Sequence, residues 1–73
     1  MSGLKKPDKN SLSEQEISIL TLAAQGLENT QIAKILFISH HTVKAHMTSV
    51  FRKLGAVNRT EAVYIAIKNN LIS

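Results

Sequence analysis

Apolar residues recur every three or four positions along most of this chain, which is the spacing of one face of an α-helix. The recurrence fills four stretches, over about residues 13–25, 30–36, 39–54 and 58–69. No segment alternates apolar and polar residues over the length of a strand. The sequence therefore predicts an all-α domain of four helices, covering residues 11–73.

The first helix is expected to begin at Ser13, whose hydroxyl can accept a hydrogen bond from the backbone three residues later. Glu16 stands where a capping box needs it, and Leu12 and Ile17 occupy the two positions of a hydrophobic staple. Gly26 is expected to end the helix, because glycine adopts the left-handed conformation that terminates helices. Local sequence alone thus predicts both ends of this helix.

The second and third helices are expected to lie close together in the chain. Asn29 is the expected cap of a short helix over residues 30–36, and Ser39 is the expected cap of a longer helix that stops before Gly55. Only a short turn around Ile38 separates them, and this side chain is expected to fill the angle between the helices. Two helices joined in this way form a helix-turn-helix, which places its second helix in the major groove of DNA.

The third helix carries two faces of different chemistry. On a wheel of about 100° per residue, its apolar residues form one narrow core-facing line: Val43, Met47, Val50 and Leu54. A separate arc is polar or small and is expected to face solvent: His41, Lys44, Ala45, Thr48 and Arg52. Lysine can donate to guanine, a small side chain can meet the thymine methyl group, and threonine can do either. An ordinary amphipathic helix with a polar outer face is the alternative interpretation.

The fourth helix is apolar on more than one side. Asn58 is expected to begin it, with Glu61 in the reciprocal position of a capping box. The residues expected to fill the core are Ala62, Val63, Ala66 and Ile67, and those expected to face elsewhere are Tyr64 and Ile65. Two apolar sides in so small a domain indicate a partner surface, and scattered surface hydrophobes are the alternative.

Length and composition limit what the chain can do. Its 73 residues suffice for one small core and leave little room for a deep substrate cleft. With no cysteine, a disulfide framework and a thiolate zinc site are excluded. No apolar run approaches the roughly 20 residues that cross a bilayer, and no plausible set of nucleophile, base and orienting group is present. We therefore expect a cytoplasmic protein that is not an enzyme and needs no cofactor.

The net charge of +4 is unevenly distributed. No acidic residue lies between Glu28 and Glu61, whereas the basic residues of that interval are Lys34, Lys44, Arg52, Lys53 and Arg59. A one-sided basic segment suits a polyanion such as DNA, because each neutralised phosphate releases a condensed counterion. The alternative is a solvated basic face without a partner.

The three histidines do not predict a metal site. His41 and His46 are five residues apart, so they point to different sides of a helix, and no inward-facing acid completes a shell. His46 lies beside the core line and is expected to be structural. His41 lies on the polar arc and is expected to contact phosphate or a base, more strongly when protonated.

The first ten residues differ from the rest of the chain. Residues 1–10 are polar and aperiodic, with several lysines and the one proline. They are expected to be a flexible arm, a linker or residues left from cloning.

From Leu12 to Leu71 the sequence resembles the LuxR/FixJ-type DNA-binding domain. The core of the match is Ile38-Ser39, Thr42-Val43-Lys44 and His46, followed by Lys53-Leu54. Further matching residues are Leu12, Ser13, Glu16, Ile19, Leu20, Ala24, Gly26, Asn29, Ile32, Ala33, Leu36, Val57, Arg59, Ala62, Val63, Ala66 and Leu71. The resemblance implies a four-helix domain of bacterial transcription regulators, commonly response regulators, with a central helix-turn-helix and a C-terminal dimerisation helix.

The resemblance also implies binding to double-stranded DNA as a dimer on an inverted repeat, with the dimer weak without DNA. Together with the helix wheel it predicts base contacts from His41, Lys44, Ala45 and Thr48. Contacts with the DNA backbone are expected from Asn29, Thr30, Ser39, Thr42, Arg52 and Lys53. The expected dimer contact is Tyr64, Ile65 and Lys68. Lys53 can alternatively neutralise the carbonyl end of its helix, and Arg59 is expected to pair with an acid such as Glu16.

Some residues depart from the family pattern. Glu28 replaces the usual serine or threonine before the second helix, and an acid there is unfavourable beside backbone phosphates. Thr30 replaces a common lysine, and Thr48 is neutral where many relatives carry a longer donor, which leaves its preferred base open. Asn70 replaces the usual glycine near the C-terminus, but asparagine also tolerates the left-handed conformation, so little change is expected.

Two other functions remain alternatives. A promoter-reading domain of a sigma factor uses a similar pair of helices and would bind DNA as part of RNA polymerase. RNA polymerase is therefore a further candidate partner. A protein-interaction module would dock its fourth helix or its polar arc on another protein. The salt dependence of binding distinguishes DNA binding from a protein contact. For DNA, a plot of the logarithm of the binding constant against the logarithm of the salt concentration has a slope (the salt slope) near −0.9 per phosphate contacted.

Overall fold

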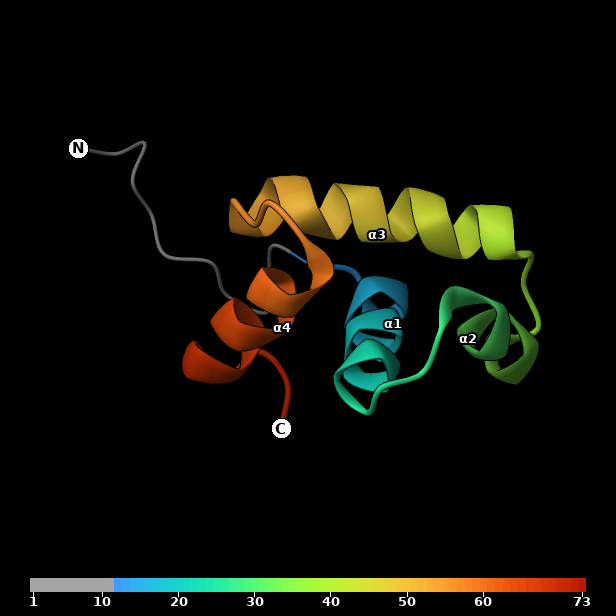
Figure 1. Cartoon of the computed structure of the whole chain (residues 1–73), viewed down its shortest axis with the longest axis horizontal. Helices are drawn as coiled ribbons and strands as arrows, with labels where there is room; N and C mark the ends of the chain where they lie inside the picture. The colour runs from blue at the N-terminus through green and yellow to red at the C-terminus, as the bar shows by residue number, and fades with distance from the viewer. Residues whose placement is uncertain (1–11) are drawn as a thin grey trace.

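The longest helix, α3, lies along one side of the domain and packs across the other three (Figure 1). The computed structural model describes residues 12–73, and in that part of the chain four helices follow one another without a strand. Their bounds are α1 Glu14–Ala24, α2 Asn29–Leu36, α3 His40–Leu54 and α4 Arg59–Lys68. The predicted all-α, four-helix fold is confirmed. The arm expected for residues 1–10 lies outside the described residues.

The N-terminus of α1 forms as the sequence predicts. The backbone N–H of Glu16 donates to Ser13 Oγ at 3.1 Å, and the N–H of Ser13 donates to Glu16 Oε1 at 2.9 Å. Leu12 and Ile17 pack into the same apolar cluster, which completes the hydrophobic staple. After α1 the chain turns at Gly26, whose φ is +89°. Both predicted ends of the helix are therefore confirmed.

The N-terminus of α2 differs from the prediction by one residue. The cap is Glu28 rather than Asn29, and the Glu28 N–H donates to Gln31 Oε1 at 2.8 Å. Asn29 is the first helical residue, and its side-chain oxygen accepts a hydrogen bond from Arg59. The prediction was wrong because this long-range contact engages the oxygen that would otherwise turn back to cap the helix.

The predicted caps of α3 and α4 are present. Ser39 Oγ accepts from the Thr42 N–H at 3.1 Å. Asn58 Oδ1 accepts from the Glu61 N–H at 2.8 Å. Glu61 differs from the expected capping box in one respect, because its Oε1 accepts from the N–H of Val57, one residue before the cap.

Two buried apolar clusters hold the helices together, and α1 and α3 contribute to both. The cluster shared with α4 and the C-terminal segment contains Leu12, Leu20, Val50, Leu54, Ala62, Ala66, Leu71 and Ile72. The cluster shared with α2 contains Ile19, Ala23, Ile32, Ala33, Val43 and Met47. Ile38 packs against this second cluster, which confirms its predicted place in the angle between α2 and α3. The predicted core line of α3 is thus divided between both clusters.

The faces of α4 differ from the prediction at two isoleucines. Ile67 was expected in the core but is 49% exposed, whereas Ile65 is half-buried against the cluster that α4 shares with α1 and α3. Fully buried Ala62 and Ala66 define the centre of the core face. At about 100° per residue, Ile65 stands about 80° from that centre and Ile67 about 120°. The prediction was wrong because small alanines, not the larger isoleucine, lie closest to the other helices.

The C-terminal segment folds back onto the core after α4. Asn70 adopts the left-handed conformation with φ +60°, as its replacement of glycine predicts. The N–H of Leu71 then donates to the Ala66 carbonyl at 2.8 Å. Leu71 and Ile72 are buried in the cluster shared with α4, so this turn closes one end of the core.

A salt bridge joins α3 to α1. Lys53 Nζ lies 2.8 Å from Glu16 Oε1, and Glu16 is only 4% exposed. Glu16 was predicted to pair with Arg59, and that prediction was wrong because Lys53 fills the position. Burial by itself would raise the pKa of the Glu16 carboxyl, but hydrogen bonds from Lys53, the Ser13 N–H and Ser49 outweigh it and hold the pKa below its usual value.

One residue of the turn between α2 and α3 is strained. Phe37 ends α2 in the left-handed conformation, with φ +59° and ψ +42°. Its side chain is 94% exposed, so burial of the ring does not compensate for the strain. Left-handed backbone costs an L-residue roughly 1–2 kcal/mol and costs asparagine less.

We expect Glu16→Gln to remove much of the acid sensitivity of the domain. Because the pKa of Glu16 is lower in the folded state, its stabilising contribution is complete above about pH 4.5. That contribution is lost as the pH falls through the folded-state value. Lys53→Met should lower the free energy of unfolding by about 1–3 kcal/mol at neutral pH, since it leaves the buried carboxylate without its cation.

Urea unfolding between about pH 6 and about pH 3 tests both expectations. Glu14→Gln is the matched control, because Glu14 is an exposed acid in the same first turn. It should keep the pH dependence of the parent chain. Equal acid sensitivity in Glu16→Gln and the parent would contradict the role of the pair.

Phe37→Asn is expected to raise the free energy of unfolding by about 1 kcal/mol, because it relieves left-handed strain without removing a buried side chain. Gly55→Ala is a control in which left-handed strain is added rather than relieved. Gly55 has φ +69° and an added Cβ would meet nothing within 4 Å, so a loss of about 1 kcal/mol there would report backbone strain alone. A lower midpoint for Phe37→Asn in chemical denaturation would show that the ring makes a stabilising contact.

Candidate functional site

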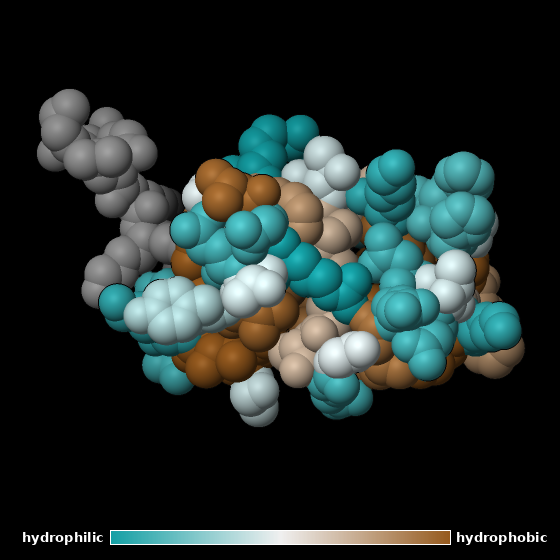
Figure 2. Space-filling model, in the orientation of Figure 1, coloured by the Kyte–Doolittle hydropathy of each residue, from teal (hydrophilic) through white to brown (hydrophobic). Residues whose placement is uncertain are grey.

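The outward arc of α3 is exposed along its length. The residues predicted to face solvent are all exposed: His41, Lys44, Ala45, Thr48 and Arg52. The opposite line is buried, with Val43 and Val50 fully buried. In Figure 2 hydrophilic side chains gather over the N-terminal half of α3, at the upper right. The predicted division of α3 into a core line and an outward arc is therefore confirmed, and α3 carries no acid.

The N-terminus of α3 presents hydroxyls and imidazoles. Ser39 Oγ and Thr42 Oγ1 lie 2.9 Å apart and share a hydrogen bond. The rings of His40 and His41 lie against one another, with centroids 4.3 Å apart. All four residues are exposed. The free N–H groups and the positive end of the helix dipole make this end suitable for an anion such as a backbone phosphate.

The middle of the outward arc combines a cation with a hydroxyl. Thr48 Oγ1 donates to the Lys44 carbonyl at 3.1 Å, so its lone pairs remain available to accept. The Lys44 ammonium stands one helical turn before Thr48, and Ala45 lies at the edge of the arc, about 60° beyond Thr48. These three side chains offer a long donor, a small apolar contact and an acceptor within one turn.

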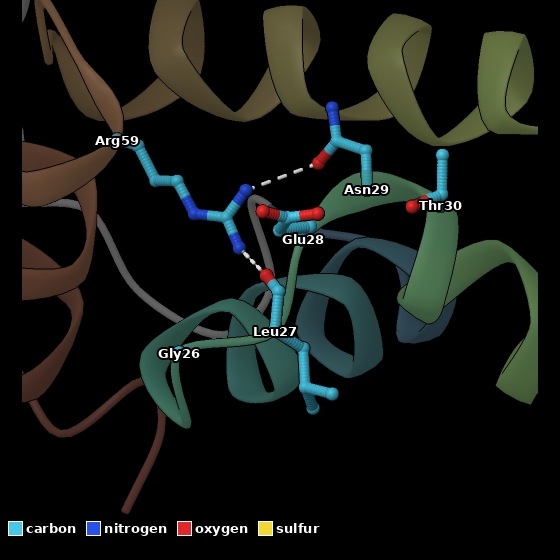
Figure 3. A pocket seen from close by; sticks show the side chains of 6 residues that line it. All are labelled: Gly26, Leu27, Glu28, Asn29, Thr30 and Arg59. Atoms are coloured by element: carbon cyan, nitrogen blue, oxygen red, sulfur yellow. Dashed lines mark hydrogen bonds between the residues drawn. The ribbon is translucent and has the colours of Figure 1, made fainter.

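The loop before α2 is tied to the start of α4 by Arg59. Arg59 Nη1 donates to Asn29 Oδ1 at 3.1 Å, and Nη2 donates to the Leu27 carbonyl (Figure 3). This link was not predicted from the sequence. One signal could have indicated it: a cation in the first turn of a helix opposes the helix dipole, so Arg59 needs acceptors outside its own helix.

A hollow of about 400 Å³ joins α2, α3 and the beginning of α4. Among its lining residues are Asn29, Lys44, Thr48, Asn58 and Arg59. The structure therefore brings the predicted backbone-contact residue Asn29 to the same hollow as the predicted base-contact residues Lys44 and Thr48. The other lining residues include Met47, Phe51 and Val57, so the hollow combines an apolar wall with the Lys44 cation and the two amides.

Lys53 is held apart from the outward arc. Its ammonium is bound to Glu16, and its side chain remains 35% exposed. Lys53 also stands in the last turn of α3, so the predicted alternative, in which it neutralises the carbonyl end of that helix, remains compatible with this contact. Of the basic residues near the end of α3, Arg52 is the one whose side chain lies on the arc.

α4 leaves apolar side chains at the surface. Tyr64 is 61% exposed, and Lys68 Nζ lies 5.7 Å from the centroid of its ring. Ile67 is exposed on the same helix, whereas Ile65 lies half-buried against the core. The predicted dimer residues Tyr64 and Lys68 are thus accessible together, and Ile67 replaces Ile65 as their accessible apolar neighbour.

Two features are absent from the part of the chain that the structure describes. Over residues 12–73, no helix is long and apolar enough to cross a membrane. In the same range, no group of three or more histidine, cysteine, aspartate or glutamate residues could hold a metal ion. The exposed arc of α3 and the hollow beside it remain the principal candidate site.

The chain matches a protein-family model described as bacterial regulatory proteins, luxR family, over residues 10–66. A solved response regulator, ChrA of a heme-sensing two-component system, is 46% identical with a TM-score of 0.83. That comparison covers 99% of this chain and 35% of ChrA.

Similar proteins in Bacillus subtilis are the transcriptional regulatory proteins YdfI, 41% identical over 69 residues, and LiaR, 39% identical over 72 residues. The alignments cover 94% and 99% of this chain and 32% and 34% of the relatives. The oxygen regulatory protein NreC of Staphylococcus aureus is 44% identical over 61 residues, or 84% of this chain and 28% of NreC. The chain spans about a third of the length of these relatives.

Proposed function

Because the chain belongs to the luxR family of bacterial regulatory proteins, we propose that it reads double-stranded DNA with α3 in the major groove. The observation that carries this proposal is the outward arc of α3, which is exposed, contains two cations and has no acid. A duplex presents a dense row of phosphates around a groove wide enough for a helix. The arc has the charge and the hydrogen-bonding groups that such a groove requires.

In this proposal the base contacts come from the middle of α3. Lys44 donates to guanine O6 or N7, Ala45 packs against a thymine methyl group, and Thr48, whose hydroxyl proton is donated to the Lys44 carbonyl, accepts from a neighbouring base. His41 stands one turn earlier and contacts a base or a phosphate at the edge of the groove. Side chains of this reach select bases, whereas the surrounding backbone contacts set the register of the helix.

Phosphate contacts surround the base-reading residues. The exposed hydroxyls of Ser39 and Thr42 lie at the positive end of α3, where an anion is stabilised. Asn29 and Thr30 provide donors at the start of α2, and Arg52 reaches a phosphate near the other end of the arc. Lys53 contributes only through ammonium N–H donors that are not directed at Glu16, since one of the three is bound there.

We further propose that two copies bind an inverted repeat through α4. The accessible contact consists of Tyr64, Ile67 and Lys68, which lie on one exposed side of that helix. Two-fold symmetry would place the two α3 helices in successive major grooves, about 34–36 Å apart. The small apolar area of this contact favours a dimer that is weak without DNA.

The proposal extends to the kind of protein in which the domain works. The relatives YdfI, LiaR and NreC are regulatory proteins about three times as long, and ChrA is a response regulator. We infer that this domain is the output module of a bacterial transcription regulator of that type. Such a module would act in the cytoplasm, where its DNA lies.

An NMR titration of the labelled chain with short duplexes, at about 50 and about 200 mM salt, is the direct test. Salt-sensitive shifts are expected at Ser39, Thr42, Lys44, Ala45 and Thr48. Shifts centred on Tyr64 and Ile65, without salt dependence, would contradict DNA binding and favour a protein partner. A duplex selected from a random pool then supplies the sequence for affinity measurements.

Lys44→Ala and Arg52→Ala should affect different properties, the first the discrimination between duplexes and the second the affinity for both. Lys44→Ala is expected to lose about 1–3 kcal/mol of discrimination between the selected duplex and one changed at the contacted base. Arg52→Ala should weaken binding to both duplexes equally and reduce the salt slope by about 0.9. Lys34→Ala, an exposed lysine on α2, is the control and should leave discrimination unchanged. Equal discrimination by Lys44→Ala and the parent would remove Lys44 from the base-reading set.

The dimer contact is tested with two isoleucines of equal exposure. Ile67 on α4 and Ile35 on α2 are each 49% exposed. Ile67→Glu should abolish cooperative binding to an inverted repeat while keeping affinity for one half-site, because burying an unpaired charge costs several kcal/mol. Ile35→Glu should retain cooperativity. Cooperative binding that survives Ile67→Glu would place the dimer contact elsewhere.

A further inference from the structure

Arg59 connects three parts of the domain that are separate in the sequence. It is the first residue of α4, yet its guanidinium reaches the loop after α1 and the first residue of α2. The acceptors are the Leu27 carbonyl and Asn29 Oδ1. The side chain is half-buried between them. One planar group therefore fixes where α2 begins relative to α4.

The contact also determines which way the Asn29 amide faces. A guanidinium has only donors, so the atom of Asn29 that faces it is the oxygen. The amide nitrogen must then point away from Arg59, and Figure 3 shows it directed toward α3. Without Arg59 the two ends of this amide could exchange places by a half-turn of the side chain.

The direction of the amide nitrogen matters because of what lies nearby. Asn29 lines the hollow that Lys44 and Thr48 also line, between the start of α2 and the outward arc of α3. An amide N–H aimed into this region would reinforce the Lys44 cation in attracting a phosphate oxygen. An amide oxygen in the same place would repel it.

We propose that Arg59 is a positioning residue for DNA binding, which holds the Asn29 amide so that its nitrogen donates to a backbone phosphate. The proposal rests on the proposed function. Arg59 acts through Asn29 and does not itself need to reach the DNA. Because Arg59 belongs to α4, the same contact ties the helix proposed to form the dimer to the phosphate-binding start of α2.

Two other roles for Arg59 make different predictions. Arg59 could bind a phosphate directly, or its charge could offset that of Glu28, which lines a neighbouring hollow with it. Both roles depend on positive charge, and lysine supplies that charge. The positioning role depends on two donors in a fixed plane, which lysine lacks.

The test uses the 73-residue chain and a fluorescent duplex of fixed sequence, about 20 base pairs long. Asn29→Ala is expected to weaken binding about 10-fold, the loss of one hydrogen bond to a charged acceptor. Arg59→Lys should weaken it to a similar extent although the charge is kept, with an unchanged salt slope. The double variant should bind no more weakly than Asn29→Ala alone.

Asn29→Asp provides a second, independent test of the positioning role. Aspartate keeps an acceptor for Arg59, so the link to α4 and the melting temperature should be retained, but it has no donor for phosphate. Binding is expected to fall at least as far as in Asn29→Ala. Gly55→Ala controls for stability, since it strains the backbone outside this contact and should leave affinity unchanged while the domain remains folded.

A measurement without DNA completes the test. The side-chain NH₂ resonances of Asn29 should move toward the values of a solvent-exposed asparagine in Arg59→Lys. Unmoved resonances, normal binding by Arg59→Lys, additive losses in the double variant, or normal binding by Asn29→Asp would each overturn the positioning role. A drop of about 0.9 in the salt slope of Arg59→Gln would instead assign Arg59 a direct phosphate contact.

The parent chain separates this inference from the proposed function. If the parent fails to bind the duplex in a salt-dependent way, the proposed function fails and the role of Arg59 fails with it. If the parent binds and Arg59→Lys binds equally well, only the role of Arg59 fails.

Discussion

The rotation of α3 about its own axis is the constraint on which the rest of the structure depends. Its apolar line inserts Val43 and Met47 into one cluster and Val50 and Leu54 into the other. Because clusters on two sides hold a single line, α3 cannot turn without exposing apolar surface from at least one of them. The outward arc is therefore set by burial on the opposite side. Residues that make no core contact are nonetheless held in a defined direction.

Polar contacts fix those relative positions of the helices that apolar packing alone does not fix. Apolar contacts are non-directional, whereas a charge-assisted hydrogen bond requires its donor and its acceptor to meet at a set distance and angle. Lys53 provides such a contact between α3 and α1, and Arg59 provides another between α4 and the loop before α2. Each joins an element near the candidate site to one behind it. The helix-turn-helix is thus positioned by two side chains outside its reading face.

Sequence reasoning predicted the features that depend on neighbouring residues. The four helices, the caps at Ser13 and Ser39, and the two faces of α3 follow from spacing and local hydrogen bonding, and the structure confirms them. The errors involve contacts across long stretches of chain. Asn29 was displaced from its capping role by a residue 30 positions away, and Glu16 met Lys53 at a separation of 37. Spacing carries no information on which of two cations reaches an acid after folding. The DNA and dimer contacts stay predictions, since they need a second molecule.

The same contacts reduce the charge available to DNA. Five cations lie between Glu28 and Glu61, which suggests a strongly basic surface. Lys53 and Arg59 are engaged by acceptors within the domain, and Lys34 lies on α2, so the outward arc of α3 retains Lys44 and Arg52. Under the proposed function, a single subunit would draw modest electrostatic affinity from this arc, since each phosphate neutralised contributes a salt slope of about −0.9. Two subunits on adjacent half-sites would double that contribution. The small number of cations on this arc is thus a physical argument in favour of the proposed binding as a pair.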